Sequence, residues 1–176
     1  MSLRVRSGRN FRGQAMIEFA LVTPILFFLM FAVLETGLLM FVVGSARFAS
    51  GEAARQETES GNSVNADQDS IAVIRGTSMG TTSLATVTEI DIYRLIEQPN
   101  GTLTQDPARI NKYRLDGTAI GAINWPPANR NVTASKSDFI GLTIFFTYSW
   151  KSSRILGQPP LNLNQSFYVR LEPQTY

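Results

Sequence analysis

A long apolar run lies near the start of the chain, and segments in which apolar and polar residues alternate follow it. From Phe19 to Val43 the chain is apolar almost throughout, interrupted by one acid, Glu35. These 25 residues, at about 1.5 Å per residue, can cross a hydrocarbon core of about 30 Å. A secretory signal peptide has a shorter apolar core of about 7–15 residues. The pattern therefore predicts a membrane-spanning helix, and the weaker alternative is a cleavage site at VGSA, which ends at Ala46.

The helical pattern continues beyond the apolar run in residues that suit water. The segment 45–60 is rich in alanine and carries charges at helical spacing, and Gly61-Asn62 is a suitable helix end. We therefore predict one helix of about 45 residues from Gln14. Residues 14–44 form its transmembrane part and residues 45–60 an amphipathic extension, which Gly51 could interrupt.

Three later segments alternate with a period of two residues, as half-buried strands do. They are TVTEIDIYRL (86–95), GLTIFFTYSW (141–150) and SFYVRLE (166–172). Three such segments predict an antiparallel sheet with one buried face, and the outer part of the helix is the simplest cover for that face. The predicted fold class is α+β: a long N-terminal helix, membrane-spanning in its first half, packed against a small antiparallel β-sheet domain in residues 61–176.

Residues 61–85 are rich in Gly, Ser, Thr and Asn and are predicted to form a loop. Within them GTSMG, positions 76–80, fits the G-x-S-x-G motif of serine hydrolases. That mechanism needs a base to take the proton of Ser78, normally a histidine, and the chain contains none. We therefore interpret this stretch as a loop without a catalytic role.

Composition narrows the chemistry further. The chain has neither cysteine nor histidine, so thiolate metal sites, disulfides and the commonest general base are excluded. No group of carboxylates has convincing metal spacing, and no glycine-rich loop suits a phosphate. We therefore expect no metal, no cofactor and no enzymatic activity.

The basic residues are unevenly placed. Arg4, Arg6, Arg9 and Arg12 precede Gly13, and no acid does. Without these four the remaining 12 basic residues face 14 acidic ones, so the net charge of +2 becomes −2. The basic balance therefore belongs to the first 13 residues, and a nucleic-acid partner is not expected. By the positive-inside bias, the arginines also keep the N-terminus in the cytoplasm.

The remaining basic cluster consists of Arg109, Lys112 and Arg114. Asp106 and Asp116 flank it, so we interpret it as a solvated loop and not as a binding surface.

The junction between the basic leader and the apolar helix reads RGQAMIEF, with four residues between Gly13 and the pair Glu18-Phe19. A basic leader, a glycine and this glutamate at the head of a long apolar helix resemble the precursors of type IV pilins. The wider string GQAMIEFALVTPILFFLMFAVLETG resembles the TadE/TadG-like minor pilins, or pseudopilins, of bacterial tight-adherence (Tad/Flp) pili. Chain length and Phe19, where the major pilin usually has tyrosine, indicate a minor subunit.

The resemblance implies a role for each residue of the junction. A prepilin peptidase would cut between Gly13 and Gln14, and Glu18, followed by Phe19, would pair with the N-terminal amine of a neighbouring subunit during assembly. The alternative for Glu18 is a simple helix-dipole interaction, worth about 0.3–1 kcal/mol. Glu35 either contacts a partner inside the membrane or reaches the outer interface. Pro24, which is expected to bend the helix, is a second candidate for a partner contact inside the membrane.

The resemblance further implies that the protein is a structural subunit that assembles or primes a pilus. Its partners would be the prepilin peptidase, other major and minor pilins, the inner-membrane assembly platform and membrane lipid. It would span the bacterial inner membrane once, with its C-terminal domain in the periplasm, and would either stay there or be incorporated into the extracellular pilus. The alternatives are an uncleaved single-pass protein with a periplasmic interaction domain and, least supported, an envelope enzyme.

Overall fold

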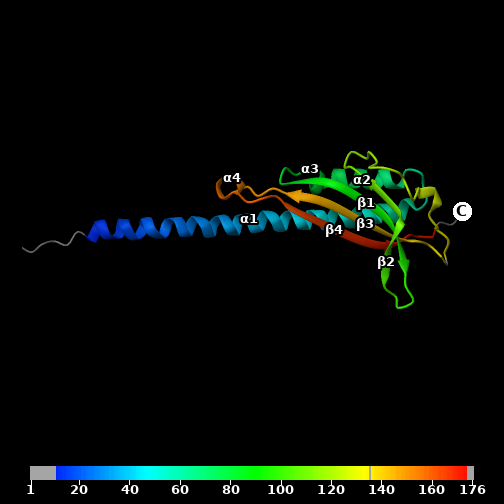
Figure 1. The fold of residues 1–176 in the computed structure, drawn as a ribbon, viewed down its shortest axis with the longest axis horizontal. Coiled ribbons are helices and arrows are strands. Elements are labelled where there is room, and N and C mark those ends of the chain that lie inside the picture. Colours follow the sequence, from blue (N-terminus) through cyan, green and yellow to red (C-terminus); the bar gives the residue numbers. More distant parts are fainter. Residues whose placement is uncertain (1–10, 135, 174–176) are drawn as a thin grey trace, which may run out of the picture. The chain divides into compact units, whose positions relative to one another are not determined.

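The computed structural model describes residues 11–134 and 136–173, and the chain divides into two compact units. The first unit ends at Gly37 and the second begins at Leu38, so the division falls inside the first helix. The elements, labelled in Figure 1, are α1 (Phe11–Ser60), α2 (Ala66–Gly76), α3 (Ser78–Thr81), β1 (Ala85–Glu97), β2 (Leu103–Tyr113), η1 (Pro127–Asn129), β3 (Phe139–Tyr148), α4 (Ser153–Leu156) and β4 (Leu161–Arg170).

The predicted long helix is present as α1 and runs without interruption through Pro24 and Gly51. It ends where the sequence indicated, because Gly61 adopts a φ of 56° and its N–H donates to the carbonyl of Glu57 at 2.9 Å. Gly51 does not break the helix. A Cβ there would lie 3.7 Å from the ring of Phe167 on β4, which is an ordinary van der Waals contact.

The second unit is built on a four-stranded antiparallel sheet in the order β2-β1-β3-β4. One face of this sheet supplies the core, and alternate residues of each strand reach it, as the period of two predicted. The core side chains of the sheet include Ile90, Ile92, Leu142, Ile144, Phe146 and Tyr148, and those of α1 include Val42, Ala46, Ala49 and Ala53. The α+β fold, with the helix packed on an antiparallel sheet, is therefore confirmed.

The prediction of a solvated loop around Arg109 and Lys112 was wrong, because both residues belong to strand β2. This strand is polar and contains Pro107, and neither feature suggests a strand. The position of β2 explains its composition. It is an edge strand, where a proline removes no needed ladder bond and charged side chains discourage pairing with another chain.

The prediction of a loop over residues 61–85 was also wrong. Helices α2 and α3 occupy most of this segment, and Ile71, Ile74 and Met79 are fully buried in the core. Ser78 opens the four-residue helix α3, and its hydroxyl donates to the Oγ of Ser45 at 3.1 Å. The Gly, Ser and Thr residues that suggested a loop lie mainly at the ends of these two short helices.

Candidate functional site

The predicted cleavage junction lies in the first turns of α1. Residues 1–10, which include Arg4, Arg6 and Arg9, lie outside the described residues. Gly13 is exposed, and a Cβ at this position would meet no atom within 4 Å. Among the described residues, none obstructs the helix surface at Gly13.

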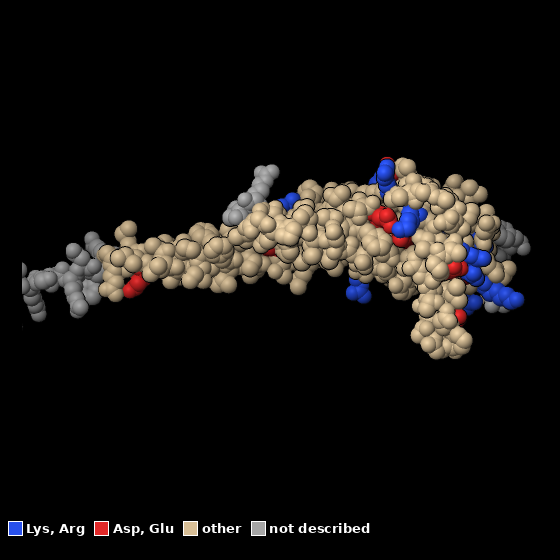
Figure 2. Space-filling model, viewed as in Figure 1, with Lys and Arg blue, Asp and Glu red and all other residues tan. Residues whose placement is uncertain are grey.

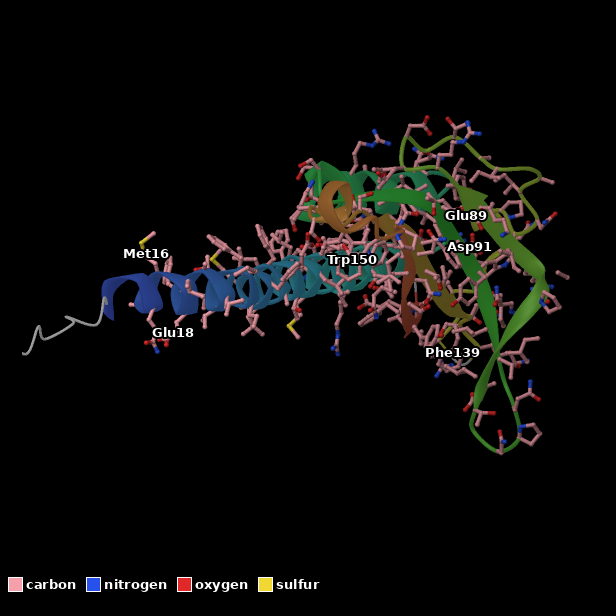
Figure 3. All side chains as sticks on the ribbon, turned by 60° about the vertical axis from the view of Figure 1, so that its left-hand side comes forward. Met16, Glu18, Glu89, Asp91, Phe139 and Trp150 are labelled. Atoms are coloured by element: carbon pink, nitrogen blue, oxygen red, sulfur yellow. The ribbon has the colours of Figure 1, made fainter. Side chains whose placement is uncertain are left out.

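Glu18 and Phe19 both project from the helix. The side-chain amide of Gln14 donates to Oε1 of Glu18 at 3.0 Å, so one helical turn joins the two residues. Phe19 is 71% exposed. Figure 3 shows Met16 and Glu18 pointing away from α1 in different directions. The carboxylate is thus available to a second molecule.

The remainder of the first unit presents large apolar side chains to its surroundings. Residues from Met16 to Leu34 include Phe27, Phe28 and Leu29, all more than half exposed. Figure 2 shows an almost uncharged surface along this part of the helix. By length and composition α1 qualifies as a membrane-spanning helix, and it is the only such helix among the described residues. Anchoring by a single N-terminal helix follows from this surface.

The polar residues inside the apolar run are accommodated in two ways. Thr23 and Thr36 donate their hydroxyls to the carbonyls of Phe19 and Ala32, at 2.6 and 2.8 Å, and so need no other partner. Glu35 differs, because it is only 7% exposed and takes part in a polar interaction. Glu35 is thus buried, whereas Glu18 is exposed.

A second group of polar residues, which the sequence did not indicate, lies inside the second unit. Arg130 is fully buried and joins two carboxylates, Glu57 at the end of α1 and Asp67 at the start of α2. The Nη1 of Arg130 lies 2.5 Å from Oε2 of Glu57, and Nη2 bonds to Oδ1 of Asp67. The other oxygen of Asp67 accepts from the hydroxyl of Tyr113 at 2.6 Å and from the amide of Asn111 at 2.9 Å. We call these five residues the Arg130 cluster.

The Arg130 cluster changes the protonation of its members. Burial raises the pKa of Glu57 to about 7, and the neighbouring charge of Asp67 adds to the rise while Arg130 opposes it. Burial also raises the pKa of Tyr113, as does its bond to Asp67. The cluster is closed to solvent and contains one cation for two carboxylates. It connects the end of the helix to the sheet and to the loop before β3, and so it is a structural tie.

A third group of charges lies on the opposite face of the sheet. Lys112 of β2 contacts Glu89 and Asp91 of β1, with Nζ 2.6 Å from the first carboxylate and 3.6 Å from the second. Figure 3 labels both acids on β1. Burial raises the pKa of Asp91 to about 6, while the hydrogen bond from Lys112 lowers the pKa of Glu89. Within the part of the chain that the structure describes, no group of three such acids could hold a metal ion.

One comparison with known proteins gave a match, and it lies in the N-terminal part of the chain. Residues 13–55 match a family model described as TadE-like protein. The match confirms the resemblance drawn from the junction sequence, and it covers Gly13, Glu18 and Glu35. Neither the curated proteins nor the solved structures gave a match.

Proposed function

We propose that this chain, whose residues 13–55 are TadE-like, is a minor pilin that assembles or primes a Tad-type pilus. It is made as a precursor, and a prepilin peptidase removes residues 1–13. Its partners are other pilins and the inner-membrane platform that assembles them. The chain spans the inner membrane once, with the leader in the cytoplasm and the sheet domain in the periplasm.

One observation carries this proposal: a single exposed carboxylate stands at the head of an apolar helix, five residues after a glycine. Apart from Glu18, the exposed side chains between Met16 and Leu34 are uncharged. Helix-dipole stabilisation accounts for an acid in the first turn. It does not account for a glycine immediately before Gln14 at the end of a basic leader. A cleavage site accounts for both.

Cleavage after Gly13 would give Glu18 a partner. The new α-amine of Gln14 would lie one turn before the carboxylate of Glu18. The side chains of these two residues are already in contact, at 3.0 Å. Neighbouring subunits with parallel helices would bring the amine of one close to the carboxylate of the next. Pairing neutralises two charges that are costly to bury among apolar helices.

Intact mass spectrometry of the membrane-extracted chain tests the proposal. In cells with an active prepilin peptidase, the mass is expected to correspond to a chain that begins at Gln14. Gly13→Leu should block the cut, because the added side chain obstructs the backbone at the scissile bond. Gly44→Leu is the matched control, since a Cβ at either glycine meets no atom within 4 Å.

The result also separates the two leading functions. A full-length mass for the parent chain, in cells that cut another prepilin, would instead indicate an uncleaved single-pass protein with a periplasmic interaction domain. If Gly13→Leu were still cut at the same bond, the glycine would not be required for cleavage.

A further inference from the structure

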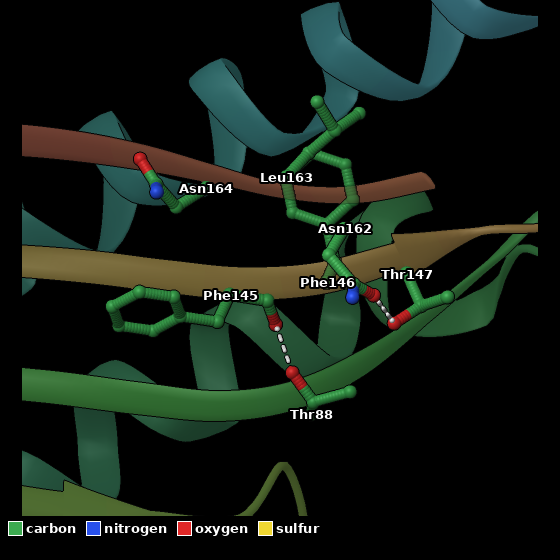
Figure 4. Close-up of a pocket in the computed structure, with 7 residues that line it drawn as sticks. All are labelled: Thr88, Phe145, Phe146, Thr147, Asn162, Leu163 and Asn164. Carbon is green, nitrogen blue, oxygen red and sulfur yellow. Dashed lines mark hydrogen bonds between the residues drawn. The ribbon is translucent and has the colours of Figure 1, made fainter. Parts of the chain in front are cut away.

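The face of the sheet turned away from α1 contains a shallow hollow of about 340 Å³ (Figure 4). Phe146 and Leu163 pack toward the core on the helix side, so their neighbours Phe145, Asn162 and Asn164 point to this outer face. The lining comes from three strands and consists of Thr88, Phe145, Phe146, Thr147, Asn162, Leu163 and Asn164. The volume lies at the lower end of the range of ligand sites, about 300–1,000 Å³.

A β-bulge shapes this hollow. The register between β1 and β3 shifts between Val87 and Glu89, which leaves Thr88 as an extra residue opposite Phe145. The hydroxyl of Thr88 donates to the carbonyl of Phe145 at 3.2 Å. Bulges redirect side chains and are frequent beside binding sites. Here the bulge places a hydroxyl next to an aromatic residue.

The polar groups of the hollow keep hydrogen-bonding capacity for a ligand. The hydroxyl of Thr147 donates to Oδ1 of Asn162 at 2.8 Å, so the NH₂ group of that amide remains as a donor. Asn164 is exposed and makes no side-chain hydrogen bond within the described residues. Its amide offers both a donor and an acceptor. Figure 4 shows Asn164 near the ring of Phe145.

The hollow carries no charge. None of its lining residues ionises, and Glu89, which follows Thr88 in the chain, is paired with Lys112 at 2.6 Å. An anionic ligand would find no cation there, and a cationic ligand would find no unpaired carboxylate of Glu89. A purely apolar ligand would leave the amides without partners, which is costly. The complementary ligand is neutral, rich in groups that both donate and accept, and apolar on one side.

We propose that this outer-face hollow binds a neutral carbohydrate. The apolar C–H face of a sugar ring stacks on Phe145, whose ring carries partial negative charge on its face. Sugar hydroxyls accept from the amide of Asn162 and exchange hydrogen bonds with Asn164 and Thr88. This activity lies beyond the minor-pilin role and does not depend on cleavage after Gly13, so either can fail without the other.

Titration calorimetry of the full chain in lipid nanodiscs tests the site, because nanodiscs avoid detergents with sugar headgroups. The probes are neutral pentasaccharides of β-1,4-linked glucose and of N-acetylglucosamine, with an oligomer of galacturonate as the anionic counterpart. We expect saturable binding of at least one neutral probe. Phe145→Ala should weaken it by about tenfold, and Phe145→Tyr should retain it.

Two further variants keep the test decisive. Asn164→Ala alters an exposed side chain without disturbing the core, and it should weaken binding several-fold. Phe167→Ala is the control, because this exposed aromatic lies on β4, the strand of Asn164, but on the opposite face of the sheet, against Gly51. Failure of both neutral probes to bind would overturn the proposal. So would binding that is unchanged in Phe145→Ala and Asn164→Ala, or binding of the anionic oligomer alone.

Discussion

Removing the cation of the Arg130 cluster should destabilise the second unit more than any surface substitution. Arg130 and Glu57 have fully buried side chains, and that of Asp67 is 3% exposed. Arg130→Met keeps an unbranched, apolar stem but removes the guanidinium group, which leaves two carboxylates without their shared cation. Breaking a buried ion pair in this way costs about 3–5 kcal/mol. We expect a loss of this size in the free energy of unfolding.

The structure also provides a matched control on α1, the helix that carries Glu57. Arg55 and Glu59 form an exposed ion pair at 3.0 Å, with side chains 70% and 51% exposed. Because water screens such a pair, Arg55→Met should change the free energy of unfolding far less than Arg130→Met does. The comparison therefore separates the effect of burial from the effect of losing a charge.

Urea unfolding of the full chain in micelles measures both effects. Trp125 is 1% exposed, and its ring centroid lies 4.7 Å from the guanidinium carbon of Arg130, so its fluorescence reports on the cluster. The double variant Arg130→Met/Glu57→Met should recover part of the loss, because it removes one of the stranded carboxylates. If Arg130→Met lowered stability no more than Arg55→Met, the interpretation of the cluster as a structural tie would be wrong.

Three further predictions concern pH, the core and assembly. The raised pKa of Glu57 means that the folded state keeps a proton that the unfolded chain releases, so stability should fall as the pH rises from 4.5 to about 7. The rise of about 2.5 units corresponds to about 3 kcal/mol, and Glu57→Gln should remove this part of the pH dependence in urea titrations. A chain that starts at Ser45 should be soluble and unfold cooperatively, whereas one that starts at Ser83 loses the helical side of the core and should aggregate. Equal thermal transitions for the two would contradict the packing. Glu18→Gln should leave processing intact but sharply reduce co-purification with other pilins, and Glu35→Gln should have the milder effect. Normal assembly of processed Glu18→Gln would return that residue to a helix-dipole role.

The sequence predicted the elements whose signal is local and periodic. The helix from Gln14 onward and the strands β1, β3 and β4 have apolar residues at the spacing of one buried face, and this spacing is visible without any knowledge of the partner. The junction from Gly13 to Phe19 could be identified for the same reason, since its residues are contiguous. All of its residues lie in the first turns of one helix, so no contact with a distant segment is needed to recognise it.

The features that the sequence did not reveal depend on contacts between distant segments. Edge strand β2 carries charges and Pro107 because only one side of it must pair. Arg130 lies in a polar loop, and nothing in its neighbours indicates that it reaches Glu57, which is 73 residues away. The hollow around Phe145 combines three strands and a bulge, and each strand alone shows only ordinary alternation.

Side-chain size along α1 shows how one helix serves two environments. Alanines at positions 46, 49 and 53 are fully buried, and their small size lets the sheet pack close to the helix backbone. Before the division at Gly37, large residues such as Phe27 and Phe28 stand exposed. Hydrophobicity alone does not distinguish these two parts of α1, because each of them has an apolar face. Close packing within the chain requires small residues, whereas contact with lipid or neighbouring helices can use large ones. The change from phenylalanine to alanine along α1 therefore marks where the helix begins to pack on the rest of its own chain, and the part before it leaves an apolar surface for others.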